Sequence, residues 1–187
     1  MCEGEDLVGA ATAQPVELLV AGENVDVKLL AEVSSAAHPP RVVAVFRRED
    51  LPGPEPRAAT LSLHGVSDPG NVGTLIRTAD AFGAGVELHG GADPTSPKAL
   101  RASAGSIWRV PLHAGEGRTV ALVAHGGQAL HEADLHGPTV FLLGSERGGL
   151  PDDVDADLRV TIPVSTESLN VATVGAIALY EWRRQNP

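Results

Sequence analysis

Short apolar runs and helical apolar stripes alternate along the second half of the chain. Five runs have the length and composition of strands: LSLHGV, GVELHG, SIWRVPL, TVFLLG and RVTIPV. Segments with helical spacing separate several of them. Strands that alternate with helices are typical of a mostly parallel sheet with helices on both faces. The pattern therefore predicts an α/β fold for this part of the chain.

The first of these helices follows the run LSLHGV. Its apolar residues recur at i, i+3, i+4 and i+7 and form one stripe, Val72, Leu75, Ile76 and Ala79. Arg77 falls outside this stripe, near the carboxyl end of a strand, where open α/β sheets bind ligands. It is either a solvated surface arginine or a functional residue, and periodicity alone does not choose between them.

Residues 1–50 have a different organisation. The stretches PVELLVAG and PPRVVAVFRR have the pattern of short strands, and VDVKLLAEVSS between them has a helical pattern, which predicts a small α/β unit. Three prolines stiffen the next stretch, LPGPEPRA, and deny it a regular strand ladder, so we interpret residues 51–58 as a linker. The larger domain then comprises residues 59–187.

The chain is acidic, with a net charge of −10. Binding to nucleic acid depends on neutralising phosphates with Lys and Arg, so the composition argues against non-specific binding to RNA. Basic residues nevertheless recur near residues 47–57, 98–109 and 183–184, which leaves room for a basic patch on an acidic body. The alternative is that these are ordinary solvated charges.

Several function classes lack their sequence signatures. The chain has no G-x-x-x-x-G-K-[ST] phosphate loop, no G-x-G-x-x-G after a strand, no H-E-x-x-H and no G-x-S-x-G. The single cysteine, Cys2, excludes an internal disulfide, and the histidines are scattered, so we expect no metal site. No apolar run is long enough to cross a membrane, and we expect a cytoplasmic protein.

Three stretches combine a strand end with glycines and polar residues: DPGNVGTLIRTADAFGA, LLGSERGGLP and IPVSTESLNVATVGAIALYE. Each has an ordinary structural explanation, because Asn71, Ser168 and Asn170 are suitable helix caps and the glycines are suitable for turns. In order and spacing, however, the three together resemble the motifs of the SpoU family of RNA ribose 2'-O-methyltransferases, within the trefoil-knotted SPOUT superfamily.

This resemblance covers the chain from about Leu61 to its C-terminus. Residues 1–50 are similar, more weakly, to the ribosomal-protein-like RNA-binding domain that many members carry, here in a shortened form. The resemblance implies a C-terminal trefoil knot, S-adenosylmethionine as cofactor, and a homodimer whose active site spans two subunits. It also implies an RNA substrate, for which we expect ribosomal RNA ahead of transfer RNA.

Two alternatives to an RNA methyltransferase stay open. One is a knotted RNA-binding protein that has lost activity, and the other is a small-molecule methyltransferase, which would suit the acidic charge. An inactive protein is expected to have lost Asn71, Arg77 or Asn170, and all three are present.

The resemblance also assigns roles to individual residues. The cofactor is expected to contact backbone groups of Gly144, Ile162 and Leu169. Five polar residues match the catalytic positions of the family: Asn71, Arg77, Glu146, Ser168 and Asn170. A guanidinium pKa of roughly 12 or more makes arginine a poor base, so we expect Arg77 to stabilise the alkoxide that develops on the ribose. The general base is left unassigned.

One position departs from the family pattern. Arg147 stands where many members have glycine after the motif glutamate. A residue with a side chain does not readily adopt positive φ, so we expect a differently shaped loop here. Because arginine side chains often contact nucleic-acid phosphates, the departure also suggests a phosphate contact.

Overall fold

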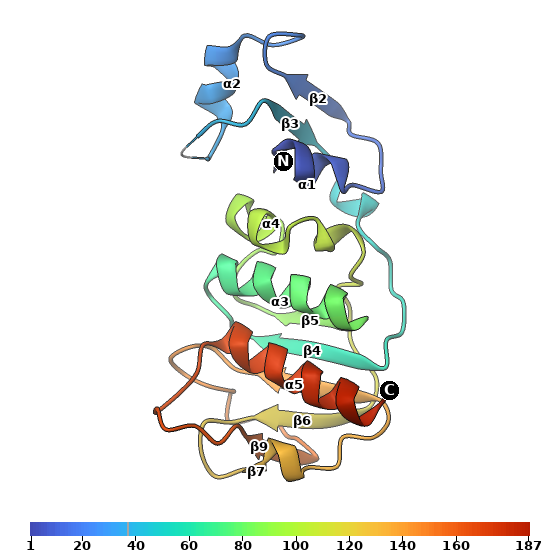
Figure 1. The fold of residues 1–187 in the computed structure, drawn as a ribbon, viewed down its shortest axis with the longest axis vertical. Helices are drawn as coiled ribbons and strands as arrows, with labels where there is room; N and C mark the ends of the chain where they lie inside the picture. The colour runs from blue at the N-terminus through green and yellow to red at the C-terminus, as the bar shows by residue number, and fades with distance from the viewer. Residues whose placement is uncertain (37) are drawn as a thin grey trace.

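The computed structural model describes residues 1–36 and 38–187, and it contains two sheets (Figure 1). The smaller sheet has three antiparallel strands in the order β1 (Cys2–Glu3), β3 (Val42–Val45), β2 (Glu17–Val20). Two short helices accompany it, α1 (Glu5–Gly9) and α2 (Val27–Val33). The two strands and the helix predicted in the first 50 residues are therefore confirmed, and β1 and α1 add to them.

The larger sheet has six strands, all in parallel pairs. Their order is β5 (Gly85–His89), β4 (Ala59–His64), β8 (Thr139–Leu143), β6 (Arg118–Leu122), β9 (Leu158–Thr161), β7 (Gln128–Ala129). At its centre Phe141 pairs with Leu61 on one side and with Val120 on the other, and all three are fully buried. The prediction of a mostly parallel sheet is confirmed, and four of the five predicted strands are present.

Helices α3 (Pro69–Phe82) and α5 (Val171–Gln185) pack against each other on one face of this sheet (Figure 1). The Leu75 side chain of α3 packs directly on the backbone of α5, since a Cβ on Gly175 would lie 2.4 Å from a methyl carbon of Leu75. The predicted stripe of α3 is fully buried. Helix α4 (Pro97–Ser103) packs on α3 in turn. None of the helices in the described part of the chain is long and apolar enough to cross a bilayer.

The N-terminus of α3 is capped by Asp68. Its Oδ1 accepts hydrogen bonds from Gly70 N at 2.6 Å and from Asn71 N at 3.1 Å, and Pro69 fills the first helical position. The expectation that Asn71 is the cap is therefore wrong, because an aspartate three residues earlier takes that role. Asn71 lies in the first turn, with its side-chain amide available for other contacts.

The second face of the larger sheet is covered by a loop. Ala121, Val140 and Leu142 form a small apolar cluster there, and Leu150 and Val154 from the connection between β8 and β9 pack on it. In residues 1–36 and 38–187 no helix packs on this cluster, so the expectation of helices on both faces holds for one face only. The connection holds a proline and four aspartates between its few apolar residues, a composition that favours an irregular segment.

The run SIWRVPL is not a strand. Ser106–Trp108 forms a 3-10 helix (η2) after a left-handed turn in which Ala104 has a φ of 48° and Gly105 a φ of 84°. Neighbouring side chains of this run are buried in succession, so pattern alone could not separate it from a buried strand. Strand β6 lies instead in RTVAL, which is short and begins with two polar residues.

The small sheet is joined to the larger unit through α4. The buried carboxylate of Glu3 on β1 accepts hydrogen bonds from Ser34 Oγ at 3.1 Å and from Ser35 N and Oγ at 3.1 and 3.0 Å. Arg101 of α4 lies 3.8 Å from the same carboxylate and donates a hydrogen bond to Ser35 Oγ at 2.9 Å. These polar contacts fix the N-terminal part at the edge of the α3 and α4 layer.

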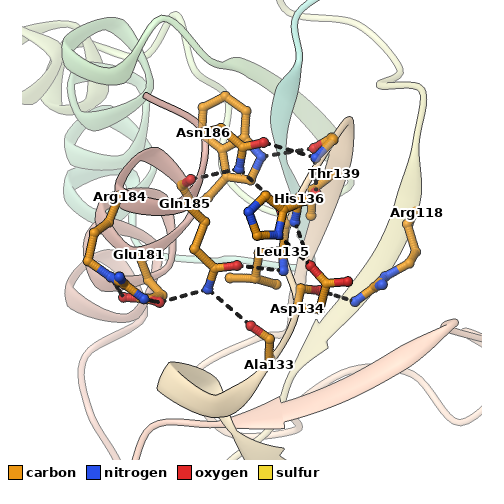
Figure 2. A network of polar contacts seen from close by, with 12 residues as sticks. Arg118, Ala133, Asp134, Leu135, His136, Thr139, Glu181, Arg184, Gln185 and Asn186 are labelled. Carbon is orange, nitrogen blue, oxygen red and sulfur yellow. Dashed lines mark hydrogen bonds and ion pairs between the residues drawn. The ribbon is translucent and has the colours of Figure 1, made fainter.

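The C-terminal end of α5 is held by a polar network (Figure 2). Gln185 accepts a hydrogen bond from Leu135 N at 2.9 Å and donates one to Ala133 O at 3.0 Å. Asn186 accepts from Gly137 N at 2.9 Å and donates to Leu135 O at 3.0 Å. These contacts hold the C-terminal end of α5 against the segment that precedes β8.

Candidate active site

The carboxyl ends of β6, β8 and β9 open into a pocket of about 640 Å³. Its walls include the loops that follow β8 and β9 and the first turn of α5. Gly144, Ile162 and Leu169, the residues expected to hold the cofactor, all line this pocket. The fold thus brings together three residues that lie on separate segments of the chain.

The loop after β8 is a tight turn. Ser145 N donates to Gly149 O at 2.9 Å, Gly149 N donates to Ser145 O at 3.1 Å, and Gly149 has a φ of 68°. A Cβ on Gly144 would lie 2.0 Å from the backbone carbon of Gly149, so only glycine fits at this position. Ala104 is the one non-glycine residue of positive φ in the described ranges, so Arg147 does not adopt that conformation.

A second, more polar hollow of about 530 Å³ adjoins the first pocket. The two share four residues: Ser145, Glu146, Arg147 and Asn170. Residues from the start of α3 and the turn before it complete the second hollow: Ser67, Asp68 and Asn71. The pocket expected to hold the cofactor and the candidate catalytic residues therefore meet along one shared edge.

Three of the candidate catalytic residues form a hydrogen-bonded chain at this edge. Asn71 Nδ2 donates to Glu146 Oε1 at 2.9 Å, and Asn170 Nδ2 donates to Asn71 Oδ1 at 3.0 Å. Asn170 Oδ1 accepts from Ala172 N at 2.9 Å and so caps α5, as its position before the helix predicts. Capping and contact with Asn71 are therefore both roles of the same side chain.

Glu146 is held by several donors. Besides Asn71, Ser67 donates to its Oε2 from Oγ at 3.2 Å and from N at 3.3 Å. Partial burial raises the pKa of the Glu146 carboxyl, but these hydrogen bonds outweigh that effect and hold the pKa below its ordinary value. The carboxylate is therefore ionised at neutral pH and is a weak base. We expect it to orient Asn71 through their hydrogen bond and not to abstract a proton.

The two other candidate residues have no such partners. Ser168 lines the larger pocket, and its hydroxyl makes no hydrogen bond to the described residues. Arg77 is exposed on α3, lines neither pocket, and forms no hydrogen bond or ion pair with any part of the chain that the structure describes. It lies six residues beyond Asn71, about 9 Å along the helix axis. One copy of the chain therefore does not bring Arg77 to the other candidates.

Ser67 and Asp68 are site residues that the sequence patterns do not single out. Ser67 binds Glu146, and Asp68 pairs with Lys98 Nζ at 2.7 Å while it caps α3. The hydrogen bond from Lys98, together with those from Asn71 N and Gly70 N, lowers the pKa of Asp68. The available signal is the Ser-Asp-Pro sequence shortly after strand β4, a turn-and-cap pattern at the edge where ligands bind.

A family model described as the SpoU rRNA Methylase family matches residues 58–180. The chain belongs to this family. The match includes the three sequence stretches that contribute to the two pockets, except for the last residue of the third, and it places the small N-terminal sheet outside the shared region.

Named relatives agree with this assignment. An uncharacterized tRNA/rRNA methyltransferase, slr1673, from Synechocystis sp. is 38% identical over 89% of this chain, which spans 67% of that relative. The 23S rRNA (guanosine(2553)-2'-O)-methyltransferase RlmP of Bacillus subtilis is 31% identical over 98% of the chain and 88% of the relative. The chain spans smaller shares, 26%, 52% and 61%, of three further curated relatives.

Solved structures extend the likeness to the N-terminal part. The SpoU methyltransferase AviRb from Streptomyces viridochromogenes, in complex with the cofactor AdoMet, matches with a TM-score of 0.80 at 26% identity. The match covers 98% of this chain and 89% of that one, so it takes in the smaller sheet as well as the larger.

Proposed function

We propose that this chain transfers a methyl group from S-adenosylmethionine to a ribose 2'-hydroxyl of ribosomal RNA. The observation that carries the proposal is the chain Asn170, Asn71, Glu146 at the shared edge of the two pockets. It couples a cofactor-sized pocket to a polar hollow in which a ribose can lie. Family membership and the named 2'-O-methyltransferase RlmP support the reaction class and ribosomal RNA as the substrate.

The larger pocket fits the proposed cofactor. Its volume of about 640 Å³ lies within the range of roughly 300–1,000 Å³ usual for small-molecule sites. Backbone groups at Gly144, Ile162 and Leu169 would hold the cofactor between apolar walls. S-adenosylmethionine supplies a methyl group that its sulfonium already activates. The protein's task is therefore to align the ribose oxygen with that methyl group and to stabilise its developing charge.

Asn71 is the residue best placed to orient the ribose. An amide offers two donor hydrogens and two acceptor lone pairs, and Asn71 uses one of each, on Glu146 and Asn170. One hydrogen and one lone pair remain for the sugar. Glu146 and Asn170 act through Asn71 as positioning residues. The unpartnered hydroxyl of Ser168 on the pocket wall provides a second contact to the substrate or the cofactor.

Arg77 acts, in this proposal, at the site of a second copy of the chain. It is exposed and lies outside both pockets of its own chain, as expected for a residue that completes a site across a dimer interface. Tyr180 on the neighbouring helix α5 is 63% exposed, which also favours an apolar interface in this layer. There the Arg77 guanidinium stabilises the developing alkoxide and the adjacent phosphate.

The remaining parts of the proposal concern the whole chain. Residues 1–50 form a substrate-binding domain, residues 51–58 are the linker, and residues 59–187 are the methyltransferase domain with a C-terminal trefoil knot. The meeting of the loops after β8 and β9 in one pocket supports the knot, since a threaded C-terminus requires such an approach. The protein acts on RNA in the cytoplasm.

The experiment is methylation of defined RNAs by the purified protein. Ribosomal RNA, transfer RNA and a small-molecule extract are each incubated with methyl-labelled S-adenosylmethionine. We expect label in ribosomal RNA, at a linkage that resists alkali, because a methylated 2'-oxygen cannot attack the neighbouring phosphate. Label in transfer RNA alone would show that the substrate is transfer RNA and not ribosomal RNA. Cofactor binding without transfer to any RNA would favour the inactive protein and refute the proposed activity.

A further inference from the structure

Most basic side chains of this acidic protein are already neutralised. Eight of the fourteen Lys and Arg side chains lie within 4.0 Å of a carboxylate: Arg41, Arg47, Arg48, Arg57, Lys98, Arg101, Arg109 and Arg184. Four make no side-chain hydrogen bond or ion pair within the described residues: Lys28, Arg77, Arg147 and Arg159. A polyanion such as RNA gains most from cations that no carboxylate of the protein has taken.

Arg147 is the one member of this unpaired set that lines either of the two pockets described above. It lines both the larger pocket and the polar hollow, and no other Lys or Arg lines either among the described residues. The two carboxylates that line the polar hollow already have partners, because Glu146 accepts from Asn71 and Ser67 while Asp68 pairs with Lys98; Glu167, on the wall of the larger pocket, makes no ion pair with Arg147. The guanidinium of Arg147 is thus the cation with free donors at the place where cofactor pocket and hollow meet.

The loop that carries Arg147 is well defined. It is closed by the two backbone hydrogen bonds between Ser145 and Gly149, and Gly148 N donates to Ser145 Oγ at 3.1 Å. Arg147 therefore stands at the tip of a short turn whose base is fixed against the end of β8. A donor fork mounted on such a turn can bind a phosphate without ordering a long loop, which lowers the entropic cost of binding.

We propose that Arg147 binds a backbone phosphate next to the target nucleotide and thereby sets the position of its ribose opposite the methyl donor. The inference rests on the proposed function and names a substrate contact for it. Arg147 is in this view an RNA-binding residue. The local cation also explains how a chain of net charge −10 presents a phosphate site, since charges beyond about 8–10 Å are largely screened at physiological salt.

The test compares Arg147→Gln with Arg159→Gln. Both variants remove one unpaired arginine and change the net charge equally, but Arg159 lies on β9 outside both pockets. We measure the KM for a ribosomal RNA fragment at several salt concentrations, and the Kd for S-adenosylmethionine without RNA by calorimetry. Arg147→Gln should raise the KM for RNA about 10-fold and lower the slope of log KM against log salt by about 0.7–0.9, as for one lost phosphate contact.

The control variant should change the KM by less than about 2-fold, and both variants should bind S-adenosylmethionine like the wild type. Arg147→Lys should recover part of the RNA affinity, because it keeps the charge but loses the fork. An equal KM and salt slope in the two glutamine variants would overturn the proposal. So would weaker cofactor binding with unchanged RNA affinity, since the anion would then be the cofactor carboxylate. Failure of the wild type to methylate any RNA would instead refute the proposed function.

Discussion

Arg77 provides the sharpest test of how the active site is assembled. It has no partner in the described chain and lines neither pocket, so Arg77→Ala should change the free energy of unfolding by no more than about 0.5 kcal/mol. Ser168→Ala should be equally mild, because the hydroxyl has no partner in the same part of the chain. Each variant should nevertheless lose about 100-fold or more in methyl transfer, as for a lost transition-state donor.

Mixing the two variants separates the two possible arrangements. If Arg77 serves the site of the other subunit, a mixed dimer has one site with both residues intact and one site with neither. Random reassortment gives homodimers and mixed dimers in a ratio of roughly 1:2:1, so about half of the dimers carry one working site of two, and activity recovers to about 25% of wild type. If Arg77 serves its own chain, every site in the mixture is damaged and activity stays near 1%.

The assay uses two differently tagged variants, co-expressed and purified in succession so that only mixed dimers remain. Their rate of label transfer to ribosomal RNA should then be about half that of wild type at equal dimer concentration. Co-purified Arg77→Ala pairs serve as the control for the tags. No recovery in the mixed dimers, or a monomer mass by light scattering at micromolar concentration, would refute the shared site.

Three further predictions concern the loop, the helix layer and pH. Gly144→Ala should weaken S-adenosylmethionine binding at least about 10-fold by calorimetry, because its Cβ would lie 2.0 Å from the facing backbone. The control is Gly148→Ala, whose Cβ meets only a serine hydroxyl at 3.1 Å and which should bind the cofactor nearly as the wild type does. Gly73→Ala should destabilise the protein by about 1–3 kcal/mol, since its Cβ would lie 2.3 Å from a carbonyl oxygen of α4. Each kcal/mol lowers Tm by roughly 2–4 °C in a thermal melt. The control is Thr74→Ala at the neighbouring exposed position. Burial, and then the neighbouring imidazole of β5, lower the pKa of His64 from its ordinary value of 6.5, so the unfolded chain binds the extra proton. The free energy of unfolding should therefore fall as pH drops below about 6.5, and His64→Gln should flatten that part of the profile; an unchanged profile in urea titrations would contradict the assignment.

The hydrophobic pattern predicts most of the larger sheet, and its failures have physical reasons. The α3 stripe is correct because a helix on one face of a sheet must bury every third or fourth residue. The strand predicted for SIWRVPL is wrong, because a run of consecutive buried residues has the same composition whether it forms a strand or a buried 3-10 turn. The prediction of helices on both faces is wrong for one face, because a loop covers Ala121, Val140 and Leu142 there. A loop has no regular hydrophobic period by which the sequence could have revealed it.

The sequence suggests the candidate site residues, but it does not predict their arrangement, and Arg77 lines neither pocket. Asn71 is separated along the chain by 75 residues from Glu146 and by 99 residues from Asn170. Their contacts depend on β8 lying beside β4 in the sheet. The Asp-Pro pair is a local signal for a cap at Asp68, but local signals could not show that the Asn71 amide, which does not cap the helix, contacts Glu146. Nor could they show that Ser67 binds Glu146, because serine before Asp-Pro is ordinary turn chemistry.

Free hydrogen-bonding capacity separates two kinds of residue at this site. Glu146 and Asn170 direct their polar atoms at the protein, so their substitution should act through the position of Asn71. Ser168, Arg77 and Arg147 have side chains without partners in residues 1–36 and 38–187. Exposed polar groups without partners contribute little to stability, so we expect these three residues to act on a ligand or a second subunit. The first set should therefore tolerate exchanges that preserve the orientation of Asn71, whereas the second should tolerate only exchanges that preserve the donor.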